Sequence, residues 1–127
     1  MGGRILIVDD DRDIVGSLQS RLEWLGYQCQ STSNGKEALR IIRENAPDII
    51  LLDLEMPELG GIEVMKQLMG VPTTDSSCLP AVVVMTAFGT VNRAVEAMKL
   101  GAQEFLTKPF DADHLSVVLR KIRERQA

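Results

Sequence analysis

Short hydrophobic runs alternate along the chain with segments in which hydrophobic residues recur every three or four positions. The runs predict β-strands, at Arg4–Val8, Tyr27–Ser31, Ile49–Leu52, Ala81–Met85 and Glu104–Thr107. The periodic segments predict helices: one carrying Ile14, Val15, Leu18, Leu22 and Leu25 and ending at Gly26, then Lys36–Asn45, Ile62–Met69, Thr90–Leu100 closed by Gly101, and a last one carrying Leu115, Val118, Leu119 and Ile122.

Five strand–helix units with short connections predict a mainly parallel sheet covered by helices on both faces. Right-handed crossovers then restrict the topology to a doubly wound α/β sandwich. The length of 127 residues suits one domain, so we assign residues 1–127 to a single unit.

Composition and charge exclude several classes of protein. The net charge is −4 and the pI is about 5.0, which disfavours direct nucleic-acid contact because phosphate neutralisation needs a basic face. The sequence has neither a membrane-spanning hydrophobic run nor a signal peptide, and we expect a cytoplasmic protein. Cys29 and Cys78 are expected to be reduced thiols. Trp24 is expected to pack in the interior.

Polar residues follow the predicted strands at the places where each strand ends. Asp9 and Asp10 follow the first strand, Asp53 the third, Thr86 the fourth and Lys108 the fifth. Parallel strands bring their carboxyl ends to one edge of the sheet, where open α/β sheets bind ligands. We therefore expect these five side chains to share one site.

These side chains suit a divalent metal ion and a phosphoryl group. Crowded carboxylates need a cation, and oxygen ligands without histidine or cysteine favour Mg²⁺. Lys108 and Thr86 could contact phosphoryl oxygens while Asp53 acts as the nucleophile. The hypothesis is that Asp53 accepts a phosphoryl group.

Four stretches, "ILIVDDD", "PDIILLDLEMP", "VVVMTA" and "GAQEFLTKPF", occur in an order and spacing that resemble the response-regulator receiver domains of two-component signalling. The resemblance covers essentially the whole chain. It implies a CheY-like, flavodoxin-like fold with strand order 2-1-3-4-5. The run "VVVMTAFGTVNRAVEAMKLGAQEFLTKPFD" looks most like receivers of nitrogen-regulator-type transcriptional activators. Because the sequence stops just after the fifth predicted helix, we expect a receiver excised from a longer regulator, with a complete single-domain regulator as the alternative.

The resemblance also implies roles for individual residues. Asp53 would accept the phosphoryl group from a phosphohistidine on a sensor histidine kinase. Mg²⁺ would be bound by the side chains of Asp10 and Asp53, by the backbone carbonyl of Glu55, and by Asp9 through water. Thr86 would move toward the phosphoryl group.

A switch in packing would follow from that movement. Phe105 is by default a core residue of its strand, but its position three residues before Lys108 makes it a switch candidate. Its rotation would change the surface of the fourth helix, fifth strand and fifth helix. That change would control homodimerisation or an output domain, with transcriptional regulation as the expected outcome.

Two segments depart from the family pattern. Gly60-Gly61 stands where the family often has Asp or Asn before the glycine, which gives the turn more backbone freedom. The loop Gly70–Pro80 is a few residues longer than usual, and we favour a tolerated insertion over a partner contact.

Three other functions compete with the switch. A haloacid-dehalogenase-like phosphatase needs a second Asp two residues after the nucleophile, where this chain has Glu55. A degenerate receiver that only binds proteins would not need the intact acidic, hydroxyl and ammonium positions. A flavin-binding protein would need a phosphate-binding loop after the first strand, where "VDDDRD" would repel phosphate.

Overall fold

The computed structural model describes residues 3–56, 59–69, 80–87, 91–108 and 111–126. Within these ranges the chain forms β1 (Arg4–Val8), α1 (Arg12–Trp24), β2 (Gln28–Thr32), α2 (Gly35–Glu44), β3 (Ile49–Asp53), α3 (Gly61–Met69), β4 (Ala81–Ala87), α4 (Val91–Leu100), β5 (Glu104–Lys108) and α5 (Ala112–Gln126). Residues 70–79, which include Cys78 and most of the loop Gly70–Pro80, lie outside the described residues, so the expectations about them are not addressed.

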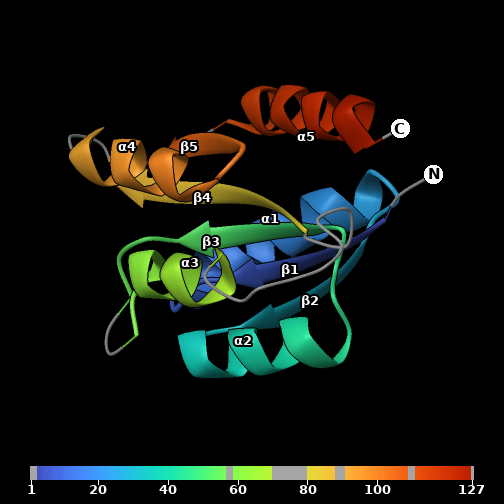
Figure 1. Ribbon diagram of the computed structural model, residues 1–127. Coiled ribbons are helices and arrows are strands. Elements are labelled where there is room, and N and C mark those ends of the chain that lie inside the picture. Colours follow the sequence, from blue (N-terminus) through green and yellow to red (C-terminus); the bar gives the residue numbers. More distant parts are fainter. Residues whose placement is uncertain (1–2, 57–58, 70–79, 88–90, 109–110, 127) are drawn as a thin grey trace.

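The strands form one sheet in the order β2-β1-β3-β4-β5, and every neighbouring pair is parallel. Helices α1 and α5 pack on one face, and α2, α3 and α4 pack on the other (Figure 1). The predicted doubly wound fold and its strand order are therefore confirmed.

The central strand β3 explains why the sequence places four consecutive hydrophobic residues at its start. Side chains alternate between the faces of a strand, so Ile50 and Leu52 join the core under α2, α3 and α4. Ile49 and Leu51 join the core under α1 and α5. Both faces of β3 are covered, and this rigid strand carries Asp53 at its last position.

Helix ends follow the signals in the sequence. The side chain of Asp11 caps α1 by accepting hydrogen bonds from the backbone N–H groups of Asp13 and Ile14. Gly26 and Gly101 adopt φ values of 100° and 120°, a left-handed conformation that favours glycine just after a helix. The predicted stops at these two glycines are confirmed.

The positions of several side chains differ from the predictions. Asp53 is the last residue of β3 rather than the residue after it. Thr86 and Lys108 lie within β4 and β5 rather than after them, because Thr86 pairs with Thr107 and Ala87 with Lys108 in the sheet. Trp24 is 76% exposed, so its predicted packing is wrong. It ends α1 off the stripe of Leu18 and Leu22, and the guanidinium carbon of Arg21 lies 5.2 Å from its ring centroid.

Phe105 is 45% exposed, so the default expectation of a core residue is wrong. It lies on β5, which is an edge strand, and its side chain borders α4 beside Val95 and Met98. An edge strand with helices α4 and α5 at its flanks leaves this side chain at the surface rather than under a helix.

The two glycines before α3 have different surroundings. A Cβ atom on Gly61 would overlap the backbone carbonyl oxygen of Asp53 and lie 2.7 Å from the Leu54 Cα atom. A Cβ atom on Gly60 would approach the Leu54 carbonyl oxygen no closer than 3.6 Å, an ordinary contact. Only glycine fits at Gly61, where α3 begins against β3. At Gly60 the surrounding space would also admit a larger residue.

Among the described residues, none of the helices combines the length and the hydrophobicity needed to span a bilayer.

Candidate functional site

Three carboxylates meet at the carboxyl-terminal edge of the sheet. Asp9 and Asp10 follow β1, and Asp53 ends the neighbouring strand β3. One carboxylate oxygen from each lies within 4.8 Å of the others. Asp9 and Asp53 are each 2% exposed, whereas Asp10 is open to solvent. The acidic residues that the sequence predicted to share a site therefore do lie together.

Lys108 reaches the same edge from β5. Its Nζ atom lies 2.7 Å from Asp9 Oδ2 and 3.3 Å from Asp53 Oδ2. One ammonium group thus contacts two buried carboxylates, which compensates part of the cost of burying them. Asp9 is held further by its Oδ1 atom, which accepts a hydrogen bond of 2.9 Å from the Asp11 backbone N–H.

The ionisation of Asp53 reflects this environment. The pKa of Asp53 is raised from 3.8 to about 6, mainly by burial and to a lesser extent by the charge of Asp9. The hydrogen bond from the Glu55 backbone N–H and the ammonium of Lys108 act in the opposite direction on this pKa. Burial lowers the pKa of Lys108, but the contacts with Asp9 and Asp53 outweigh burial and leave it raised. The site thus has surplus negative charge and would gain from a cation.

Thr86 and Glu55 join the site from β4 and from the loop after β3. Thr86 is buried, and its Oγ1 atom donates a hydrogen bond of 3.1 Å to Glu55 Oε1. The backbone N–H of Ala87 donates to Glu55 Oε2 at 3.2 Å. The backbone N–H of Glu55 in turn donates to Asp53 Oδ1 at 3.0 Å.

From the sequence, Glu55 was expected to bind the metal through its backbone carbonyl, but the hydrogen bonds from its side chain to the end of β4 were not predicted. Part of the information needed to predict these side-chain contacts was present in the sequence and the strand order. Glu55 follows Asp53 by two residues, and β3 lies beside β4, whose end carries Thr86. A carboxylate at that position is therefore close to any donors at the end of β4.

The donors of the acidic cluster fit Mg²⁺. Asp9, Asp10 and Asp53 contribute oxygen atoms only, which are the ligands that hard divalent cations prefer. The raised pKa of Asp53 indicates that its charge is poorly compensated by the protein alone. The acidic pocket expected for a magnesium-binding domain is present.

Phe105 borders residues of α4 and is not one of the residues that form the acidic cluster. Its exposed ring borders a surface cavity of about 330 Å³ together with Ala94, Val95, Met98 and Lys99. The candidate switch residue therefore lies on the outer side of β5, next to α4.

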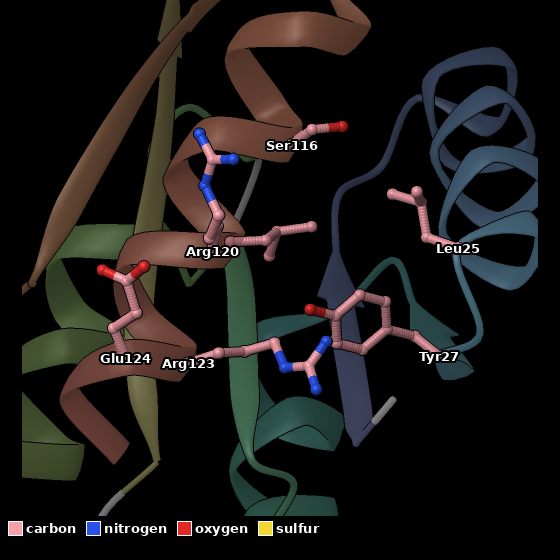
Figure 2. Close-up of a pocket in the computed structure, with 7 residues that line it drawn as sticks. Leu25, Tyr27, Ser116, Arg120, Arg123 and Glu124 are labelled. Atoms are coloured by element: carbon pink, nitrogen blue, oxygen red, sulfur yellow. The ribbon is translucent and has the colours of Figure 1, made fainter. Parts of the chain in front are cut away.

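Two further cavities lie along α5. A groove of about 520 Å³ between α1 and α5 is lined by Ile14, Leu18 and Leu115 and extends to Lys108. The other cavity, of about 430 Å³, is lined by Tyr27 and by residues of α5 that include Arg123 (Figure 2). Tyr27 directly precedes β2 whereas Asp53 ends β3, and the sheet is parallel, so this cavity lies at the opposite edge of the sheet from Asp53. The Arg123 guanidinium carbon is 5.9 Å from the Tyr27 ring centroid. Only the first groove adjoins the predicted site.

The chain matches the sequence profile described as response regulator receiver domain over residues 5–120. It belongs to this family. Regulatory protein AtoC of Escherichia coli K12 is 34% identical over 124 residues, which are 98% of this chain and 26% of AtoC. Transcriptional regulatory protein ZraR of Klebsiella oxytoca is 41% identical over 115 residues, 91% of this chain and 25% of ZraR. The chain thus spans about a quarter of the length of these curated relatives.

A crystal structure of NtrX from Brucella abortus superposes with a TM-score of 0.87 at 28% identity, covering 99% of this chain and 28% of that one. These relatives confirm the prediction of a receiver most like those of nitrogen-regulator-type activators. The function predicted from the sequence is confirmed at the level of the family: a receiver domain acts as a phosphorylation switch in two-component signalling.

Proposed function

We propose that Asp53 accepts a phosphoryl group from a phosphohistidine on a sensor histidine kinase, and that this modification changes the surface formed by α4, β5 and α5. The observation that carries the proposal is the ammonium of Lys108, 3.3 Å from Asp53 Oδ2 at the end of a strand buried on both faces. A nucleophile on such a strand is preorganised, and a fixed cation beside it suits a transferred phosphoryl group.

The transfer requires few protein groups. An oxygen of Asp53 forms a bond to phosphorus while the phosphorus–nitrogen bond of the donor breaks, and the imidazole leaves with the electron pair and takes up a proton. Lys108 balances charge on the phosphoryl oxygens, and Thr86 donates a hydrogen bond to one of them. Bound Mg²⁺ would supply further neutralisation of that charge. Asp10, Asp53 and the Glu55 carbonyl would hold it directly, and Asp9 through water.

The groove between α1 and α5 supports contact with the kinase. Its hydrophobic lining by Ile14, Leu18 and Leu115 leads to Lys108, so a helix of the kinase seated there would bring its histidine toward Asp53. We also propose a cytoplasmic location for the protein, as expected from its sequence.

The response surface is proposed to be the face that carries Phe105. Val95, Met98 and Phe105 are all exposed on α4 and β5 and border one surface hollow, so they form a continuous hydrophobic patch. We assign this patch to a second copy of the chain, with homodimerisation after phosphorylation as the outcome. Because AtoC and ZraR are about four times as long as the matched region, we also infer an output domain for transcriptional regulation in the complete protein.

The competing phosphatase reading has a specific weakness. Such an enzyme would need Glu55 to exchange protons with a substrate, yet both of its carboxylate oxygens accept hydrogen bonds from the end of β4. Burying the Asp53 carboxylate raises its pKa and disfavours its ionised form. A receiver that only binds proteins would not need a carboxylate in this environment.

The test is to incubate the protein with acetyl phosphate and Mg²⁺ and measure the intact mass. One base-labile phosphoryl group per chain is expected on the wild type and on the control variant D113N, which alters an exposed carboxylate on α5. None is expected on D53N. Label retained by D53N would overturn the assignment, and turnover of many equivalents of a phosphate ester would favour the enzyme. Sedimentation before and after labelling tests dimerisation.

A further inference from the structure

The side chain of Glu55 bridges two donors at the end of β4. Its Oε1 atom accepts from the Thr86 hydroxyl at 3.1 Å, and its Oε2 atom accepts from the Ala87 backbone N–H at 3.2 Å. Both carboxylate oxygens of Glu55 therefore accept hydrogen bonds from the end of β4. Thr86 is 3% exposed, so its hydroxyl is held in a place with little access to water.

These donors are also the ones that β4 can offer to an anion on Asp53. The two strands are neighbours in the sheet, with Asp53 paired with Met85, the residue before Thr86. The backbone N–H of Glu55 donates to Asp53 Oδ1 at 3.0 Å, which keeps Glu55 next to the acceptor. A phosphoryl group on Asp53 would therefore meet the Glu55 carboxylate at the donors that it needs.

We propose that Glu55 is a built-in competitor of the phosphoryl group: its carboxylate occupies the Thr86 and Ala87 donors before modification and must leave them when Asp53 is phosphorylated. This inference rests on the proposed function of Asp53. It assigns a regulatory role to the side chain of Glu55, in addition to the metal-binding role proposed for its backbone carbonyl.

The competition has two physical components. Forming the phosphorylated state breaks two hydrogen bonds to a charged acceptor, and such bonds are stronger than those between neutral groups. The displaced carboxylate also remains near a phosphoryl group that is negatively charged as well, while the ammonium of Lys108 is already shared between Asp9 and Asp53. Both components shift the equilibrium toward the unmodified protein.

Three variants separate these components. E55Q removes the charge and leaves only one oxygen to accept, E55D keeps the charge on a side chain too short to bridge both donors, and E55A removes the group. E63Q is the matched control, because Glu63 lies on nearby α3, is exposed, and contacts Lys66 at 3.8 Å. Thermal unfolding checks that each variant is folded, and E55Q and E55D remain informative if E55A is not.

The experiment measures the affinity for beryllium fluoride, a phosphoryl analogue, at saturating Mg²⁺, together with the fraction labelled by acetyl phosphate. For E55Q and E55A the affinity is expected to rise about fivefold or more, the equivalent of one net hydrogen bond. E55D is expected to show a smaller rise, and E63Q none. In addition, the Ala87 amide proton of the unmodified, metal-free protein is expected to shift upfield in E55A and E55Q.

The outcomes separate this inference from the proposed function. If wild type and E63Q bind the analogue and the Glu55 variants bind it no better, the competition is overturned while the function of Asp53 stands. An Ala87 amide resonance that is the same in all variants would also overturn it. If no protein binds the analogue or takes up label, the proposed function fails, and the competition fails with it.

Discussion

The Lys108 ammonium lies 3.3 Å from the Asp53 carboxylate, although the strands that carry them are separated by β4. Lys108 spans this gap because its long side chain crosses the end of the intervening strand. The same ammonium lies 2.7 Å from Asp9. One cation therefore joins β1, β3 and β5 at the edge of the sheet.

Replacing Lys108 by Met should destabilise the protein in metal-free buffer. The change leaves two buried carboxylates without their cation, and breaking a largely buried ion pair costs about 3 kcal/mol. We expect a loss of this size in the free energy of unfolding, measured with urea. K66M, which breaks an exposed pair with Glu63, should change it by less than about 0.5 kcal/mol. Equal effects of the two variants would contradict the arrangement.

The pKa of Asp53 predicts a pH-dependent effect of D53N. With a folded-state pKa of about 6 against 3.8 for the unfolded group, ionisation of Asp53 costs stability as the pH rises between these values. D53N should therefore be more stable than the wild type in metal-free buffer above pH 6, by about 2–3 kcal/mol, and this advantage should disappear near pH 4. Unfolding curves from pH 4 to pH 8 measure it, and an unchanged difference across that range would argue against a raised pKa.

Mg²⁺ should stabilise the wild type at neutral pH, since the ion binds the folded cluster of carboxylates. Mass action gives about 1.4 kcal/mol at ten times the dissociation constant, and a chelator should reverse it. D10N should bind Mg²⁺ more weakly in calorimetric titrations because one of the clustered oxygens is lost. D13N, on the exposed first turn of α1, should bind as the wild type does. A loss of affinity in both variants would indicate that Mg²⁺ binding depends on the overall negative charge of the protein rather than on the three clustered carboxylates.

The two glycines before α3 should respond differently to substitution. G61A places a methyl group against the Asp53 carbonyl oxygen and should cost about 2 kcal/mol or more. G60N has room for its side chain, and Gly60 is the residue whose carbonyl accepts from the Val64 N–H at the start of α3. Asn is a good residue at a helix start, so G60N should leave stability within about 0.5 kcal/mol. Thermal unfolding measures the stability of both variants. If G61A were as stable as the wild type, α3 would have to shift to make room for the added methyl group.

Periodicity and turn signals were sufficient for the fold, because the features involved are local. The buried run of β3 and the stops at Gly26 and Gly101 can be identified from a few neighbouring residues. The gathering of Asp9, Asp53 and Lys108 followed from one property of parallel sheets, the common edge of their strand ends. The sequence therefore predicted which residues meet there.

The exposure and the hydrogen bonds of single side chains could not be predicted, because they depend on the local surroundings of each residue in the fold. Trp24 and Phe105 are large and hydrophobic, yet one lies beside the buried stripe of α1 and the other on an edge strand, so both are exposed. The bridge from Glu55 to Thr86 and Ala87 depends on the path of the chain after β3, which hydrophobic patterning does not report.

The tight junction between β3 and α3 limits how a signal can leave Asp53. Because the first residue of α3 lies against the Asp53 carbonyl, the backbone has little room to move on that side of Asp53. Under the proposed phosphorylation of Asp53, we expect the structural change to pass through the end of β4 toward β5, the strand that carries Phe105.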